Sequence, residues 1–192
     1  MQIGKLKRAR FIFICITLCL LVETPVPKAQ HDDSLAPFVP TPHDVVNRML
    51  ELADVTDQDI VYDLGCGDGR IVITAAQRFG ARGVGIDFDP QRIAEANANA
   101  ERAGVTHLVR FIEQDAMTVD VSEATVVTLY LLSSSNLKLR PRLTTQLPVG
   151  ARIVSHAFSM GDWVADKIEK FTDSVQGTRT LYLWKHDGTL RP

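Results

Sequence analysis

The stretch VYDLGCGDGR, residues 61–70, places three alternating glycines directly after an apolar run. Gly65, Gly67 and Gly69 predict a turn whose backbone approaches a ligand closely, because glycine has no side chain in the way. The run before the turn, 59–64, has the composition of a buried strand, and the residues after it follow a helical pattern. A strand, a glycine turn and a helix in this order are typical of nucleotide-binding α/β domains.

The charges around the turn argue against a phosphate ligand. Arg70 occupies the position of the last glycine in the dinucleotide fingerprint G-x-G-x-x-G, and Asp63 and Asp68 flank the turn. Two like charges about 4 Å apart repel by about 1 kcal/mol in bulk water, and by more in a partly buried cleft. A pyrophosphate would meet this repulsion, whereas a cation would be attracted. S-adenosylmethionine (SAM), which carries a sulfonium and an ammonium group, fits such a turn.

The rest of the chain alternates strands and helices around the turn. Helices are predicted from residue 41, after the turn (70–80), at 89–104 and at 136–147, and further strands at 82–87, 107–115, 124–132 and 151–158. Two C-terminal apolar segments joined across Gly177 predict an antiparallel pair. The pattern indicates a Rossmann-like, doubly wound α/β domain with a mostly parallel sheet and an antiparallel C-terminal strand.

Two of these helices have clear start signals. Thr41 is expected to cap the first helix, with Pro42 at its first position and Asp44 in its first turn. Asp89 is expected to cap the helix that begins at Pro90. These signals fix where each helix leaves the edge of the sheet.

The first 29 residues differ from the rest. The basic run KLKRAR precedes FIFICITLCLLV, in which Thr17 is the only polar side chain. Twelve helical residues span about 18 Å, short of the roughly 30 Å of a bilayer core. We therefore expect residues 1–29 to be a signal peptide for secretion or periplasmic export, or else a short membrane anchor or part of a cytoplasmic chain. Residues 30–40 then form an extended lead-in to one domain, 41–192, and membrane contact is expected only through the leader.

The composition narrows the choice of partners. Hydrophobic residues make up 45% of the chain and charged residues 23%, which is ordinary for a globular domain. Outside residues 1–29 there are 16 basic and 22 acidic groups, a balance that disfavours a nucleic-acid partner. Cys66 is the only cysteine outside that segment, and the scattered histidines show no metal-ligand spacing.

The glycine turn resembles motif I of the class I (seven-strand) SAM-dependent methyltransferases, whose pattern is acid-x-G-x-G-x-G. The resemblance implies a seven-stranded sheet and a methyl-transfer activity. It also implies which residues hold the methionine part of SAM, namely Asp63 and the backbone of Gly65, Cys66, Gly67 and Gly69.

Two acids beyond the turn extend this resemblance. It implies that Asp87, at the end of the second strand, binds the ribose hydroxyls, while Asp89 two residues later is better explained as a helix cap. It also implies that Asp115, after the third strand, lies near the adenine amino group, with Ala116 offering a backbone contact.

Residues 38–163 carry a closer resemblance. The segments FVPTPHDVVNRMLELADV, VVTLYLLSSSNLKLRPRL and RIVSHAFSMGDW are similar to the small archaeal protein lysine methyltransferase and its mitochondrial relatives. This resemblance implies that the acceptor is a lysine side chain of a protein. It also implies that the segment VPTP, with Pro40 and Thr41, folds over the cofactor, and that the end of the fourth strand faces the acceptor.

Methyl transfer to a lysine requires alignment and a neutral amine. The free amine has a pKa of about 10.4, and an apolar cleft would lower it. Tyr130, at the end of the fourth strand, could orient the amine, and His156, at the end of the fifth, could accept a proton or a hydrogen bond. Each could equally be a core residue.

Three alternatives remain open from the sequence. The first is a small-molecule methyltransferase, for which the chain has little spare length to build a lid. The second is a non-catalytic SAM-binding or structural module. The third, an NAD-type oxidoreductase, is disfavoured by Arg70 and by the carboxylates around the turn.

Overall fold

The computed structural model describes residues 39–192. The expectations for the leader 1–29, and for all but the end of the lead-in 30–40, fall outside the described residues. Within 39–192, no helix has the length and apolar character needed to cross a membrane.

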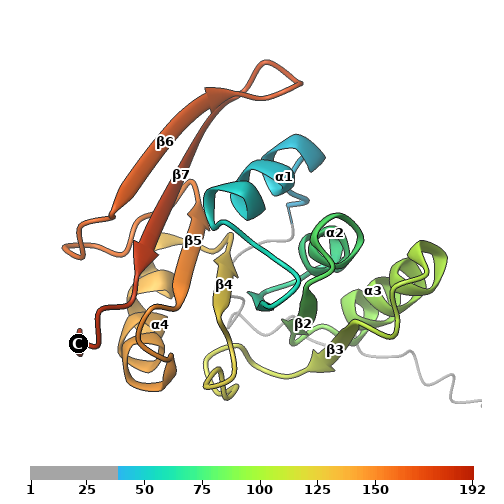
Figure 1. Cartoon of the computed structure of the whole chain (residues 1–192), viewed down its shortest axis with the longest axis horizontal. Coiled ribbons are helices and arrows are strands. Elements are labelled where there is room, and N and C mark those ends of the chain that lie inside the picture. Colours follow the sequence, from blue (N-terminus) through green and yellow to red (C-terminus); the bar gives the residue numbers. More distant parts are fainter. Residues whose placement is uncertain (1–38) are drawn as a thin grey trace, which may run out of the picture. The chain divides into compact units, whose positions relative to one another are not determined.

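A mixed sheet of seven strands runs through this part of the chain (Figure 1). Its order is β3-β2-β1-β4-β5-β7-β6, and the first five strands in that order are parallel. β7 runs antiparallel to both of its neighbours. The strands are β1 (Ile60–Leu64), β2 (Arg82–Asp87), β3 (Val109–Glu113), β4 (Val126–Leu129), β5 (Arg152–His156), β6 (Lys167–Thr172) and β7 (Thr178–Lys185).

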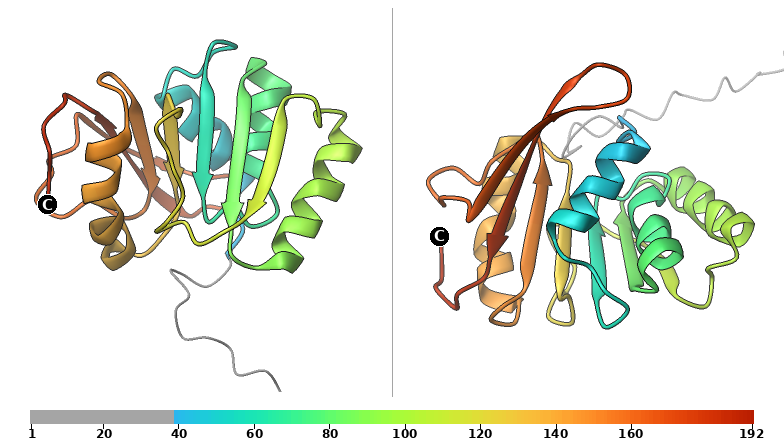
Figure 2. Two further views of the ribbon diagram at one scale, coloured as in Figure 1. Left: turned by 90° about the horizontal axis from the view of Figure 1, so that it is seen from below. Right: turned by 45° about the horizontal axis from the view of Figure 1, so that its top comes forward.

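Helices cover the two faces of the sheet unequally. α1, α2 and α3 pack on one face and α4 on the other, as Figures 1 and 2 show. Successive strand residues point to opposite faces, so that Val61 belongs to the core under the three helices and Tyr62 to the core under α4. The helices are α1 (His43–Leu52), α2 (Arg70–Phe79), α3 (Pro90–Ala103) and α4 (Ser133–Gln146).

The predicted doubly wound, mostly parallel sheet and its antiparallel C-terminal strand are confirmed. Two parallel strands are shorter than the expected ranges 107–115 and 124–132: β3 spans Val109–Glu113 and β4 spans Val126–Leu129. α4 begins at Ser133, earlier than the expected residue 136, because the carbonyl of Leu132 accepts the amides of Ser135 and Asn136.

One expected helix cap is confirmed and one is wrong. The carboxylate of Asp89 accepts the amide of Gln91 at 2.8 Å, with Pro90 at the first position of α3. Pro42, not Thr41, holds the cap position of α1, and no side chain caps that end. Proline has no amide hydrogen and its φ is preset, so Pro42 begins the helix while Thr41 is left for another contact.

The ring of Phe111, on β3, packs against Gly69 of the glycine turn and Gly85 of β2. A Cβ atom on Gly69 would lie 2.6 Å from the Phe111 ring, and one on Gly85 would lie 2.5 Å from it and 2.9 Å from Cys66 Sγ. The ring therefore occupies the space that two side chains would otherwise take. This close packing explains why Gly85 is required in the middle of β2, where the strand geometry alone would accept any residue.

We predict that Gly85→Ala lowers the free energy of unfolding by about 1–3 kcal/mol, the usual effect of overpacking a core. Denaturant unfolding followed by circular dichroism measures this change. Phe111→Leu in the same chain should recover part of the loss by making room for the methyl group. Equal midpoints for the wild type and Gly85→Ala would contradict the packing described.

Candidate functional site

The glycine turn lies at the carboxyl end of β1, between β2 and β4. The strand order reverses there, because β2 and β3 extend to one side of β1 and β4 and β5 to the other. In open α/β sheets ligands bind at such a reversal, beyond the carboxyl ends of the strands. Gly65, Gly67 and Gly69 have φ values of 82°, 54° and 78°, a left-handed backbone that favours glycine.

The second strand holds the turn in place. The carbonyl of Ile86 accepts the amides of Gly65 and Cys66 at 2.8 and 2.9 Å. The carboxylate of Asp87, which is 9% exposed, accepts the amide of Gly67 at 2.9 Å and that of Asp89 at 3.0 Å. Each carboxylate oxygen can accept a further hydrogen bond, so Asp87 can shape the turn and still receive ribose hydroxyls.

Asp63 is a buried carboxyl group directly beside the turn. It is 2% exposed, and the hydroxyl of Thr128 on β4 donates to its carboxylate at 2.8 Å. Burial raises the pKa of Asp63 to about 7, the Thr128 hydrogen bond opposes this rise, and the charges of Asp87 and Asp68 add to it. A carboxyl group held in this state gains a counter-charge when a cation binds next to it.

Asp68 does not contribute the free negative charge expected from the sequence. Its carboxylate accepts hydrogen bonds from Arg70, at 2.8 Å from Nε and 2.5 Å from Nη2. Burial raises the pKa of Asp68, but the bonds from Arg70 outweigh burial and hold the value below the ordinary one. Arg70 thus neutralises Asp68, and Asp63 is left as the acid predicted to meet a cationic ligand.

The segment before α1 contacts the turn through Arg70. Thr41 is 4% exposed and its carbonyl accepts Arg70 Nη1 at 2.7 Å, whereas Pro40 is exposed. The structure thus brings residues 39–42 to the edge of the glycine turn. Their role as a cover over SAM stays a prediction.

The predicted adenine contacts lie in the loop that follows β3. Asp115 is exposed and its carboxylate accepts the amide of Met117 at 2.8 Å, while Ala116 is buried. The amide of Gln114 donates to the carbonyl of Asp87 at 2.9 Å. This loop therefore lies beside Asp87, the residue predicted to bind ribose. Sequence reasoning missed Phe88, whose ring is 53% exposed directly after Asp87 and offers a flat apolar surface. An exposed aromatic next to a strand-end acid was the available signal.

Tyr130 and His156 lie together at the ends of β4 and β5. Their ring centroids are 4.0 Å apart, and the Phe158 ring stacks on Tyr130 with centroids 6.4 Å apart. Tyr130 and Phe158 are half-buried and His156 is 1% exposed. The two residues predicted to serve the acceptor thus form one aromatic cluster.

Burial makes His156 a weak base. It lowers the pKa of His156 to about 4, with Arg179 adding to the effect and Asp173 opposing it. Nδ1 of His156 is buried without a hydrogen-bond partner among the described residues. A neutral imidazole of this kind can accept a hydrogen bond but holds a proton poorly at neutral pH, so orientation of an amine suits it better than proton removal.

Asn136, which sequence reasoning also missed, supports this cluster. Its amide nitrogen donates to Ser155 Oγ and to the carbonyl of Phe158, both at 3.2 Å. The connection includes Ala157 at a φ of 67°, an uncommon value for a residue with a side chain. Asn136 therefore holds a strained loop that carries Phe158.

Cys66 does not provide a nucleophile. Its thiol is 5% exposed, and burial, followed by the charges of Asp63 and Asp87, raises its pKa well above the ordinary range. The described residues also contain no cluster of His, Cys, Asp or Glu that could hold a metal ion. The turn is suited to binding through its backbone and carboxylates.

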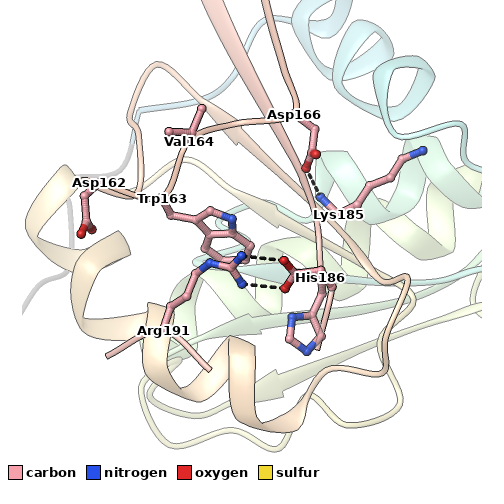
Figure 3. Close-up of a pocket in the computed structure, with 8 residues that line it drawn as sticks. Asp162, Trp163, Val164, Asp166, Lys185, His186 and Arg191 are labelled. Carbon is pink, nitrogen blue, oxygen red and sulfur yellow. Dashed lines mark hydrogen bonds and ion pairs between the residues drawn. The ribbon is translucent and has the colours of Figure 1, made fainter. Parts of the chain in front are cut away.

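A surface hollow of about 400 Å³ lies elsewhere (Figure 3). Arg191 packs over the Trp163 ring at 4.4 Å and pairs with Asp187 at 2.8 Å, as Figure 3 illustrates. Lys185, another lining residue, lies on β7 opposite Arg152, the first residue of β5. The glycine turn is at the other end of the parallel strands, after β1. The hollow therefore does not belong to the candidate site.

The sequence is similar to several lysine methyltransferases. It is 48% identical over 77% of the chain to a protein-lysine N-methyltransferase of Saccharolobus islandicus, covering 92% of that protein. It is 36% identical over 66% of the chain to the adenine nucleotide translocase lysine N-methyltransferase of Mus musculus, of which it spans 52%.

A solved structure supports SAM as the cofactor. An RNA methyltransferase of Salinibacter ruber in complex with S-adenosyl-L-homocysteine has a TM-score of 0.76 and 52% identity, covering 80% of this chain and 97% of that one. S-adenosyl-L-homocysteine is SAM without its methyl group, and the buried Asp63 and the left-handed glycines fit such a molecule. The model of the ANTKMT methyltransferase domain matches residues 63–167. The chain belongs to this family of SAM-dependent methyltransferases.

Proposed function

We propose that this protein transfers a methyl group from SAM to the side-chain amine of a lysine in another protein. The observation that carries the proposal is the similarity to the Saccharolobus islandicus protein-lysine N-methyltransferase, which extends over 92% of that protein. The aromatic cluster of Tyr130, His156 and Phe158 agrees with it, because an apolar cleft favours the neutral form of an amine.

The residues of this chain would act by binding and orientation. SAM supplies an electrophilic methyl group when it is bound. Asp63 would face its cationic end, and Asp87 the ribose, while the turn itself fixes the direction of approach. Tyr130 and the neutral His156 would align the lysine amine and exclude water, which suits a displacement whose main requirement is alignment.

Methylation of RNA is the second candidate, because the Salinibacter ruber relative is described as an RNA methyltransferase. The charges of this chain oppose it. Acidic groups outnumber basic ones, and Arg48, Arg70 and Arg152 each pair with a carboxylate of the same chain. Phosphate binding draws on free basic groups, so the protein substrate is preferred.

We predict that Asp63→Asn weakens SAM binding about 10- to 100-fold, the effect of losing a charged hydrogen-bond partner, and raises thermal stability. The folded chain keeps the Asp63 proton up to about pH 7, whereas the unfolded carboxyl loses it near its ordinary value of 3.8. Stability contributed by this group is therefore lost as pH rises from about 4 to 7. The Asn variant avoids that loss. Calorimetry and thermal unfolding at pH 8 measure both changes.

The same group predicts a pH dependence of SAM binding in the wild type. Below about pH 7 the cation must displace the Asp63 proton, so affinity should fall by about tenfold per pH unit. The Asp63→Asn variant is the control and should lack this slope. Parallel slopes for the two proteins would disconnect Asp63 from the cation.

Asp87→Ala should weaken SAM binding by at least tenfold, because the carboxylate shapes the turn through Gly67 and is expected to bind ribose. Asp89→Ala removes a helix cap and an exposed ion pair with Arg92, and should cost about 1 kcal/mol of stability with little change in affinity. Titration calorimetry on both variants separates the two acids. Equal losses of affinity would contradict the ribose assignment.

The activity itself is tested with labelled SAM and a cell extract. We expect label in protein that survives nuclease and is recovered as methyl-lysine after hydrolysis. Tyr130→Phe and His156→Phe should retain SAM binding while lowering the labelling rate. Label only in RNA or in small molecules would assign the protein to one of those classes, and binding without any transfer would identify a non-catalytic module.

A further inference from the structure

Arg70 has an unusual position for a cation. It is the first residue of α2, and the positive end of a helix dipole disfavours a positive side chain there. The guanidinium turns back from the helix and is 22% exposed. Its three nitrogens all donate: Nε and Nη2 to the two oxygens of Asp68, and Nη1 to the carbonyl of Thr41.

The segment that receives this third bond has few other means of attachment. Pro40 and Pro42 lack amide hydrogens, so the residues around Thr41 have two fewer backbone donors, and none of residues 39–42 is part of a strand. Thr41 is nevertheless buried, and its carbonyl accepts Arg70 across 29 residues of sequence. Arg70, directly after the glycine turn, thus donates a side-chain hydrogen bond to a segment whose prolines cannot donate backbone ones.

Asp68 connects Arg70 to the glycine turn and to α3. It stands between Gly67 and Gly69, its carboxylate is held by Arg70, and its backbone carbonyl accepts Asn99 Nδ2 of α3 at 2.8 Å. The fork geometry of arginine allows two parallel bonds to a carboxylate while a further nitrogen reaches a third acceptor. Lysine, with a single nitrogen, cannot reproduce this arrangement.

We infer that Arg70 is a positioning residue that couples the segment 39–42 to the shape of the glycine turn, so that SAM binding and closure of this segment support each other. The inference rests on the proposed function only in that SAM occupies the turn; the identity of the methyl acceptor does not enter. It also explains why this chain has arginine where the dinucleotide fingerprint has glycine.

The test compares Arg70→Ala, Arg70→Lys and a control, Arg48→Ala. Arg48 also fastens α1, but it donates to Glu169 of β6, at 2.8 Å from Nη2, and has no bond to the glycine turn. Arg70→Ala should weaken SAM binding at least tenfold by calorimetry, and Arg70→Lys should recover only part of the loss. Arg48→Ala should lower the unfolding temperature and leave SAM affinity within about twofold of the wild type.

Hydrogen exchange supplies a readout that a purely structural role would not change. In the wild type and in Arg48→Ala, SAM should slow exchange in the peptide spanning residues 39–45. In Arg70→Lys, which keeps the charge and should remain folded, this slowing should be reduced. Wild-type affinity or full SAM-dependent protection in Arg70→Lys would overturn the coupling, whatever acceptor the enzyme methylates.

Discussion

The carboxylate of Asp87 accepting the amide of Gly67 is the contact on which the candidate site depends. It fixes a left-handed turn against the neighbouring strand, beside the point where the strand order reverses. The glycine turn also sets where α2 begins, and so positions Arg70 for its hydrogen bond to the carbonyl of Thr41. Phe111 fills the space beneath, which two glycines leave open. A single carboxylate thus serves both the backbone of the turn and the ligand expected above it.

Asp63 illustrates the opposite relation between stability and function. Its carboxyl group is buried with one hydroxyl partner, and its pKa lies near 7. A core chosen only for stability would hold an apolar or amide side chain there. The position is understandable if the missing partner of this acid is the positive charge of the cofactor. His156 is likewise a buried polar side chain, and its Nδ1 has no hydrogen-bond partner among the described residues. The position is understandable if that partner is the methyl acceptor.

Much of this was predictable from the sequence, because the signals were local. Alternating apolar runs, glycines and the Asp89 cap depend on neighbours within a few residues, and they gave the sheet and the cofactor turn. The cap at Thr41 was wrong, and the pairing of Asp68 with Arg70 was missed. The cap was wrong because Thr41 contacts Arg70 across 29 residues of sequence, which no local pattern contains. The pairing of Asp68 with Arg70 joins residues two positions apart and was a local signal. Asn136 was missed because its partners, Ser155 and Phe158, are about 20 residues away. Phe88 directly follows Asp87 and was overlooked although the two are neighbours in sequence. The leader lies outside the described residues.

The hairpin of β6 and β7 has a consequence for how the molecule is made. Its turn reaches the beginning of α1, where the carboxylate of Asp44 accepts the amide of Ser174 at 2.5 Å, and β7 completes the hydrogen bonding of β5 (Figure 1). During synthesis the contact between α1 and this hairpin can therefore form only after residue 174 has been added. Contacts between such distant parts of a chain form slowly, and until then β5 exposes an unpaired edge. The nascent chain therefore exposes an aggregation-prone edge until β7 has been synthesised.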